Sequence, residues 1–514
     1  MSSPASAAPA SHTLLSPRRQ ILAGLVLALS NFMVVLDLTI ANVSVPHIAG
    51  NLGISLDQGT WIITSYAVAE AICVPLTGWL AGRFGAARMF VLSMMGFGFF
   101  SLLCGMSVTL GMLVACRIGQ GICGAPLMPM SQTLMLRVFP PEKRGMAMGI
   151  WAMTTLLGPA LGPIIGGFIS DSYSWHWIFL INLPVAAACT VAAVVLLRPV
   201  ETPTLKLPID MVGLVLLVFW IGCLQIMLDI GRDRDWFGDP LIVALAVMAF
   251  LGFCVFIIWE MTEEHPIVDL RIFRHRGFSY SVATLALCFG AYFSSVVIIP
   301  QWLQTSLGYT ATKAGFITAL TATAAIFTSQ IVSRLVGKVD PRLMISLAVT
   351  WLGFMSLWRT TWTSGADFWT LATPQLIQGF ALSFFIIPLT TLSLSSVRPE
   401  ETASAAGLQN FLRTMAIAIS TSLTLTIWGD AQRIARSELV GKLQPDQTMN
   451  TLSNAGLSIE QGRQLISNLT DQEAMALAVD HTFFVTAIVL FIAAGLVWLS
   501  PRPKEGAADL SAVH

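Results

Sequence analysis

Residues 20–46 read QILAGLVLALSNFMVVLDLTIANVSVP, and this stretch carries a single charged side chain, Asp37. A helix needs about 20 apolar residues to cross a bilayer, and in lipid a helix pairs every backbone polar group of such a stretch. Further apolar stretches follow at residues 58–81, 89–107, 109–136, 145–168, 177–197, 210–229, 240–259, 277–300, 312–333, 343–361, 368–396, 403–428 and 481–499. The sequence therefore predicts an all-α polytopic membrane protein with 14 transmembrane helices.

The loops between these stretches set the expected orientation. Most of the 28 Lys and Arg fall in loops on one side of the membrane, and basic residues are enriched in cytoplasmic loops. We therefore expect both termini in the cytoplasm, with residues 1–19 as a disordered tail and residues 500–514 as a second tail. The first apolar stretch is too long for a cleaved signal and is typical of a retained anchor.

The composition excludes several classes of protein. With 55% hydrophobic and 11% charged residues, there is too little polar material to cover a soluble globule of 514 residues. A formal net charge of +0 gives no reason to expect nucleic acid as a partner. All eight cysteines lie in predicted spans, and no CxxC or Cys/His spacing suggests a metal site. We therefore expect no disulfide framework, no metal and no cofactor.

Two parts of the chain resemble each other at an interval of eight spans. Gln120 and Gly121 recur 258 residues later as Gln378 and Gly379, and residues 80–83 are echoed 255 residues later. The repeat predicts a 6+2+6 arrangement. Its parts are an N-terminal six-helix bundle at 20–197, a two-helix insert with flanking loops at 198–276, and a C-terminal six-helix bundle at 277–499 that includes an outer loop at 429–480. Repeated halves of transporters meet at a central binding site, so the repeat favours transport over enzyme activity.

Several ionisable residues lie inside predicted spans, among them Asp37, Glu70 and Arg117. Burying a charge at a helix centre costs on the order of 3 kcal/mol on insertion scales, so each such residue needs a reason. A carboxylate that alternately meets an apolar cavity and a nearby Arg can take up and release a proton. We therefore expect Asp37, Glu70 and Arg117 to couple transport to protons. The alternative is structural, with the carboxylates capping neighbouring helices and Arg117 making permanent hydrogen bonds.

Other polar and glycine-rich positions complete the candidate site. The polar residues that we expect to line a substrate cavity, on position alone, are Thr39, Asn42, Tyr66, Gln120, Tyr292, Gln409, Asn410 and Arg413. Small residues let helices approach closely and prolines bend them. The sequence GPALGPIIGG at residues 158–167 therefore predicts a kinked face on which another helix pivots, or close packing without motion. Its key residues are Gly158, Pro159, Gly162, Pro163, Gly166 and Gly167.

Four motifs in this order resemble the major facilitator superfamily, in particular its fourteen-helix drug:proton antiporter (DHA2) branch. They are LDLTIANVSVP at 36–46, GWLAGRFG at 78–85 followed by Arg88, RIGQG at 117–121 and GPIIGG at 162–167. The resemblance implies the major facilitator fold, and it gives a conformational role to Gly78, Arg83, Gly85 and Arg88. At Gly82 the superfamily usually has an Asp that takes part in a cytoplasmic gate lock, so this lock must be built otherwise here.

A closer resemblance is to EmrB-type inner-membrane subunits of Gram-negative tripartite multidrug efflux pumps. It is carried by WHWIFLINLP at 175–184, LQIMLD at 224–229, PIVDL at 266–270 and PLTTL at 388–392. The resemblance implies a proton-coupled antiporter of the inner membrane that exports hydrophobic, often weakly acidic toxic compounds, including antibiotics, and draws energy from the proton gradient. It also implies a periplasmic adaptor (membrane fusion protein) and an outer-membrane channel as partners.

Three other functions are compatible with a polytopic chain. A stand-alone exporter of one dedicated metabolite or siderophore would differ from a tripartite pump in lacking a neighbouring adaptor gene. An enzyme of lipid metabolism would need clustered His and Asp, whereas the seven His lie scattered in tails and loops, so we expect no enzyme. A sensor would need an attached soluble domain. The outer loop at 429–480, with a break expected at Pro445, is either a solvated helical extension or a docking surface.

Overall fold

The computed structural model describes residues 15–140, 143–204, 208–232, 234–336, 338–398, 401–442 and 458–501. Of the two predicted tails, residues 1–14 and 502–514 lie outside this range, as does the break expected at Pro445. The first described helix already begins at Pro17, inside the segment for which we expected a disordered tail.

The described residues fold into helices. Their bounds are α1 (Pro17–Leu52), α2 (Leu56–Cys73), α3 (Thr77–Phe84), α4 (Ala86–Gly105), α5 (Leu110–Gly124), α6 (Leu127–Val138), α7 (Arg144–Ser172), α8 (Trp177–Leu180), α9 (Asn182–Leu196), α10 (Met211–Ile230), α11 (Pro240–Thr262), α12 (Arg276–Thr305), α13 (Ala311–Leu335), α14 (Pro341–Arg359), α15 (Phe368–Ser395), α16 (Thr402–Lys442) and α18 (Ile459–Leu496). Short 3-10 turns join some of them, such as η1 (Val74–Leu76) and η5 (Leu270–Arg274).

The number of membrane spans agrees with the sequence prediction. Within the described residues, 13 helical segments are long and apolar enough to cross a bilayer, and the bent helix α7 makes up to 14. The bend of 40° in α7 falls at Pro159, where proline removes a backbone hydrogen bond and crowds the preceding turn. Two spans consist of helices in series, with a proline at each junction: α2–η1–α3 at Pro75 and α5–α6 at Pro126.

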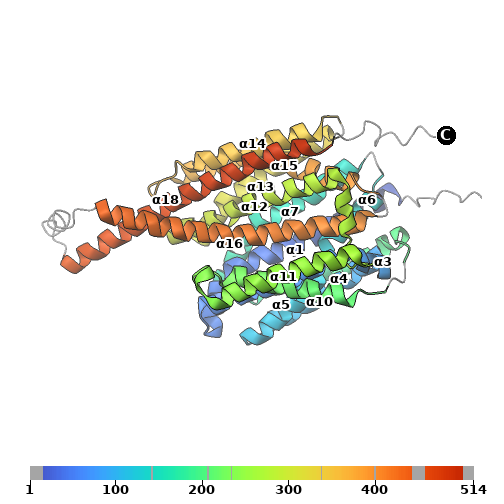
Figure 1. Cartoon of the computed structure of the whole chain (residues 1–514), viewed down its shortest axis with the longest axis horizontal. Coiled ribbons are helices and arrows are strands. Elements are labelled where there is room, and N and C mark those ends of the chain that lie inside the picture. The colour runs from blue at the N-terminus through green and yellow to red at the C-terminus, as the bar shows by residue number, and fades with distance from the viewer. Residues whose placement is uncertain are drawn as a thin grey trace, which may run out of the picture.

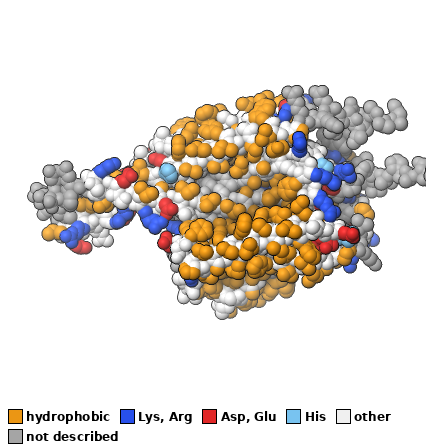
Figure 2. Space-filling model, in the orientation of Figure 1, with side chains coloured by type: hydrophobic (Ala, Val, Ile, Leu, Met, Phe, Trp, Pro, Cys, Tyr) orange, Lys and Arg blue, Asp and Glu red, His pale blue; other side chains and the backbone are white. Residues whose placement is uncertain are grey.

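The surface has the character of a membrane protein. Figure 2 shows hydrophobic side chains over the flanks of the bundle, while charged side chains gather toward its two ends. Large apolar side chains point outward along the helices, as Phe250 and Ile258 do on α11, which are 66% and 65% exposed. Such a belt would be costly in water and is what a lipid-facing surface requires. The chain is therefore a multi-pass membrane protein.

The helices run roughly along one axis and pack in two groups (Figure 1). In the first part of the chain α1 packs against α7 and α9; in the last part α12 packs against α16 and α18. The two groups meet where α7 lies against α13 and where α16 lies against α3 and α6. The pair α10 and α11 packs together, and α10 touches both α2 and α16. Whether these groups form units of six, two and six helices stays a prediction.

Helices α16 and α18 extend well beyond the rest of the bundle at one end (Figure 1). They pack side by side there, and Arg436 Nε lies 2.5 Å from Asp471 Oδ1. The described parts of the predicted outer loop 429–480 are therefore helical. The described ends of the chain lie at the opposite end of the bundle.

Candidate functional site: a buried ion pair and its surroundings

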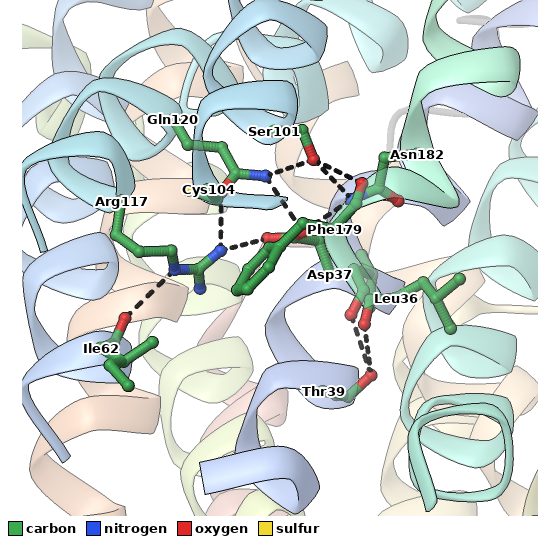
Figure 3. Close-up of polar contacts among 11 residues, drawn as sticks. Leu36, Asp37, Thr39, Ile62, Ser101, Cys104, Arg117, Gln120, Phe179 and Asn182 are labelled. Carbon is green, nitrogen blue, oxygen red and sulfur yellow. Dashed lines mark hydrogen bonds and ion pairs between the residues drawn. The ribbon is translucent and has the colours of Figure 1, made fainter. Parts of the chain in front are cut away.

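Asp37 forms the centre of a polar cluster inside the first group of helices (Figure 3). It lies on α1 with no exposed surface, and its Oδ2 is 2.5 Å from Nη1 of Arg117 on α5. Its other oxygen, Oδ1, accepts hydrogen bonds from the amides of Gln120, at 3.0 Å, and of Asn182, at 2.7 Å. Both carboxylate oxygens therefore have charged or polar donors, as a buried charge requires.

Arg117 is held from several sides. Its Nε donates to the carbonyl oxygen of Ile62 on α2 at 3.1 Å, and Nη1 also donates to Oε1 of Gln120 at 2.8 Å. The guanidinium carbon lies 4.3 Å from the ring centre of Tyr66 and 5.6 Å from that of Phe179. Aromatic faces attract cations, so these rings stabilise the charge and keep water away from it.

The two charges of this pair depend on each other. A buried ion pair is stable only as a pair, because removing one charge leaves the other uncompensated in a medium of low dielectric constant. Protonation of Asp37 would leave Arg117 without its counter-ion, so a change of charge here must be accompanied by movement of the helices that carry the two residues. Among the described residues, no group of three or more His, Cys, Asp or Glu could hold a metal ion.

Glu70 and Arg413 are two further buried ionisable residues, one in each group of helices. Glu70 lies on α2, one turn after Tyr66, and Arg413 lies on α16; both are buried. The guanidinium of Arg413 lies 5.4 Å from the ring centre of Phe289 on α12 and contacts Met128 on α6. Two of the three predicted coupling residues thus form one ion pair, and the third, Glu70, is buried on α2, the helix whose Ile62 carbonyl accepts a hydrogen bond from Arg117.

The other residues predicted for the cavity fall into three sets. Tyr66 and Gln120 belong to the cluster around Asp37. Gln409 and Asn410 are buried on α16 near Arg413, and Asn410 donates to Gln132 Oε1 of α6 at 3.1 Å, across the two groups of helices. The remaining three are not gathered at these places: Thr39 faces α7 and donates to the carbonyl oxygen of Gly158, Asn42 is exposed, and Tyr292 is half-buried on α12.

The glycines of α7 lie against α1. A Cβ atom at Gly158 would lie 2.5 Å from Val35, one at Gly162 2.1 Å from Thr39, and one at Gly166 2.8 Å from Ile40. All three distances are shorter than real Cβ contacts, so only glycine permits this approach of the two backbones. Pro159 and Pro163 lie in the same helix, and Gly167 is buried beside Gly166. The pivoting role of this face stays a prediction.

The loop motif at 78–85 also lies at a close contact. A Cβ at Gly78 would be 2.5 Å from Oγ of Ser404 on α16, and Gly85 has a φ of 90°, which favours glycine. Arg83 and Arg88 are exposed. The carboxylate of Glu201, which we did not predict, accepts the backbone N–H groups of Ala87 and Arg88 at 3.0 Å each. Glu201 therefore caps the N-terminus of α4 and supplies a carboxylate beside a motif in which Gly82 replaces the usual Asp.

A second buried polar cluster lies in the other group of helices and was not predicted either. Arg359 at the end of α14 has no exposed surface and donates from Nη2 to Oε1 of Gln375, at 2.8 Å, and of Gln378, both on α15. Its Nη1 lies 3.4 Å from Oγ of Ser295 on α12.

Comparison with known proteins places this geometry in a family. The family model for the Major Facilitator Superfamily matches residues 27–421. The chain is 42% identical to the multidrug export protein EmrB of Escherichia coli (strain K12) over 93% of this chain and 94% of that protein. It is 38% identical to the fatty acid resistance protein FarB of Neisseria gonorrhoeae over 93% and 95%. Among solved structures, the proton:xylose symporter XylE matches with a TM-score of 0.59 at 13% identity, covering 95% of this chain and 97% of that one. The chain belongs to the major facilitator superfamily.

Proposed function

We propose that this protein is a proton-coupled antiporter that exports hydrophobic toxic compounds from the cytoplasm or the inner leaflet by alternating access. The observation that supports it best is the fully buried Asp37–Arg117 pair, which joins α1 to α5 and is hydrogen-bonded to α2 and α9. Ionisable residues inside membrane spans often belong to proton relays in pumps and transporters. The export of drugs is supported by the similarity to relatives named for multidrug export and for fatty acid resistance.

In the proposed cycle, Asp37 or Glu70 takes up a proton while the cavity faces outward. Loss of the negative charge weakens the hold on Arg117 or Arg413 and favours the inward-facing state. On the cytoplasmic side the returning attraction of Arg117 favours release of the proton, and cargo binding accompanies the return. In this cycle Arg117 and Arg413 stay positively charged, and the proton on the carboxyl group decides whether that charge is compensated.

The proton gradient supplies enough energy for such a cycle. A membrane potential of roughly 150 mV contributes about 3.5 kcal/mol for each proton that enters. At one proton for each neutral cargo molecule this supports about a 300-fold concentration gradient of the cargo.

We further propose that the protein lies in the bacterial inner membrane with both termini in the cytoplasm. The projecting ends of α16 and α18 would then lie in the periplasm, where they could meet an adaptor that leads to an outer-membrane channel. The length of this projection and the position of the described chain ends at the other end of the bundle support this orientation.

Transport by purified protein in liposomes with an internal pH-sensitive dye tests the proposal. With an imposed proton gradient, hydrophobic weak acids, lipophilic cations and neutral dyes are added in turn. We expect the wild type to show cargo-dependent proton flux. This flux should fall at least about 100-fold in Asp37→Asn and clearly in Glu70→Gln, because each variant replaces a carboxylate that is proposed to carry the proton. Full proton-driven transport in both variants would overturn the assignment of these carboxylates. No flux with any compound, from folded protein, would favour an exporter of one dedicated substrate or a pump that needs its adaptor.

A further inference from the structure

The polar cluster around Asp37 has a counterpart in the second group of helices. The interval of 258 residues that matches Gln120 with Gln378 also matches Arg117 with Gln375. In each cluster these two positions lie one turn apart on the same helix and face a polar partner on a neighbouring helix. The two clusters therefore occupy equivalent places in the repeat.

The same intervals show which residues of the second cluster correspond to the other residues of the first cluster. Asp37 corresponds to Ser295, again 258 residues later. The interval of 255 that relates residues 80–83 to 335–338 matches Cys104 with Arg359. Cys104 Sγ lies 3.6 Å from Oε1 of Gln120, as Arg359 contacts Oε1 of Gln378. In the second cluster the arginine therefore lies on a different helix from the one that carries it in the first cluster. A serine occupies the position that corresponds to the aspartate.

The two clusters consequently differ in charge. The first is neutral because Asp37 compensates Arg117. In the second, the guanidinium of Arg359 meets only amide and hydroxyl oxygens. Within the described part of the chain no ion pair joins Arg359 to Asp or Glu. A full positive charge is therefore enclosed without a counter-ion, which is unfavourable in a protein interior.

Two buried donors without a partner also indicate that an acceptor is missing beside Arg359. Nε of Arg359 and Nε2 of Gln375 are buried and have no hydrogen-bond partner among the described residues. Both groups can only donate, so the missing partner is an acceptor, and the charge of Arg359 favours an anionic one. A carboxylate has two oxygens and could accept from both groups at once.

Buried aromatic side chains pack around this cluster. The guanidinium carbon of Arg359 lies 5.2 Å from the ring centre of Phe483 and 5.9 Å from that of Trp362. Trp302 stacks on Trp362 at 5.7 Å, and Tyr292 lies one turn before Ser295 on α12. Aromatic surfaces gain much from contact with an apolar molecule and little from contact with a hydrated inorganic ion.

We propose that Arg359, together with Gln375 and Gln378, binds the carboxylate of an amphipathic organic cargo. The proposal rests on the export function proposed above and names the residues that would bind an acidic cargo. The cargo carboxylate takes the part that Asp37 plays in the first cluster, while the apolar body of the cargo packs against the aromatic side chains. The first group of helices then carries the proton and the second carries the charge of the cargo.

Replacing Ser295 tests this directly, because the repeat shows which residue would neutralise Arg359 from within. Ser295→Asp supplies the carboxylate that Asp37 supplies in the first cluster, and Ser295→Asn has the same size without the charge. Binding of 2-naphthoate and of tetraphenylphosphonium is measured by calorimetry on the full chain in nanodiscs, without a proton gradient. The ratio of the naphthoate Kd to the tetraphenylphosphonium Kd should be at least about tenfold higher in Ser295→Asp than in Ser295→Asn, as expected for loss of a charge-assisted hydrogen bond.

Arg359→Gln should raise the same ratio relative to the wild type, and thermal unfolding of each variant checks that it is folded. Equal ratios in Ser295→Asp and Ser295→Asn would overturn the proposal, as would a wild type that binds tetraphenylphosphonium but not naphthoate. A wild type that is stabilised by chloride relative to gluconate, with that effect lost in Ser295→Asp and no change in naphthoate binding, would assign the site to an inorganic anion and also overturn it. Because binding is measured without a gradient, a failure of proton coupling would appear only in the liposome assay.

Discussion

At Gly162 the helices α1 and α7 come so close that a methyl group has no room. A Cβ there would lie 2.1 Å from Oγ1 and 2.7 Å from Cβ of Thr39. We expect Gly162→Ala to lower the midpoint of thermal unfolding, with an overpacking cost of about 1–3 kcal/mol that exceeds the gain in helix propensity. Gly222→Ala on α10 is the matched control, since nothing lies within 4 Å of its Cβ. Equal midpoints for the two variants would contradict the close packing.

Glu260 on α11 is a buried carboxylate with one unsatisfied oxygen. Its Oε2 accepts the N–H of Val268 at 3.1 Å, whereas Oε1 has no hydrogen-bond partner among the described residues. The position of a Cβ on Gly213 lies 2.5 Å from this oxygen and 2.2 Å from Oδ2 of Asp210, so the two carboxylates are close neighbours.

Glu260→Gln should therefore raise the thermal stability at pH 8. The amide keeps an acceptor for Val268, removes one of two neighbouring negative charges and adds a donor that can reach Asp210. A gain of about 1–3 kcal/mol is expected from satisfying a buried polar group. Thermal unfolding in detergent measures it, and a lower midpoint than that of the wild type would show that the ionised carboxylate is needed.

Which site residues the sequence reveals depends on how each contrasts with its neighbours. Asp37, Glu70 and Arg117 stand out because a charge in an apolar stretch is costly. Asn182 and Gln375 complete the two clusters but are neutral amides, which are common in membrane helices and give no such signal. Arg359 lies near the end of the predicted span 343–361, where an arginine is expected to reach the interface, and only the packing shows that it points inward.

At the scale of elements, Glu401 ties the start of α16 to the start of α12. Arg274 Nη2 lies 2.5 Å from Oε1 of Glu401, and the ring of His275 lies 3.0 Å from Oε2. Partial burial raises the pKa of Glu401, but hydrogen bonds from the backbone of Arg398 and from His275, with the charge of Arg274, hold its pKa below the ordinary value of 4.5.

A carboxyl group whose pKa is lowered by folding stabilises the fold at pH values above the ordinary pKa of that group. This contribution disappears as the pH falls through the lowered pKa of the group in the folded protein. The thermal midpoint should therefore fall more steeply in the wild type than in Glu401→Gln when the pH is lowered from about 6 to about 3.5. Glu438→Gln on α16, an exposed acid without an ion pair among the described residues, serves as control and should follow the wild type. Parallel curves for Glu401→Gln and the wild type would refute the contribution.

The boundaries of the elements show where hydropathy stops being informative. The span predicted at 403–428 ends where the apolar residues end, yet α16 continues to Lys442. A helix outside the membrane needs only a partner for its exposed faces, and α18 provides one, as the Arg436–Asp471 contact shows. The bend in α7, in contrast, could be predicted from Pro159 and Pro163, because proline acts on the helix that contains it.

For the whole molecule, length and apolarity were sufficient to predict the membrane spans, because each span satisfies its backbone by itself. The placement of the two groups of helices against each other could not be predicted, since it depends on contacts between residues far apart in sequence. The hydrogen bond between Asn410 and Gln132 and the approach of Gly78 to Ser404 are examples. Alternating access requires that some of these contacts break during transport.

A disulfide across this seam tests whether the contact between η1–α3 and α16 opens during transport. The Cβ of Thr77 lies 3.6 Å from the Cβ position of Gly407, within the range that a disulfide needs. In a chain whose native cysteines are replaced, oxidised Thr77→Cys/Gly407→Cys should lose nearly all cargo-dependent proton flux, and dithiothreitol should restore it. Ala49→Cys/Gly59→Cys is the matched control, because its Cβ positions are also 3.6 Å apart but both lie on neighbouring helices of the first group. If the two groups rock as bodies, this second cross-link leaves most of the flux. Full flux after complete cross-linking of the first pair would mean that the α3–α16 contact persists throughout the cycle, and that access alternates by movements elsewhere.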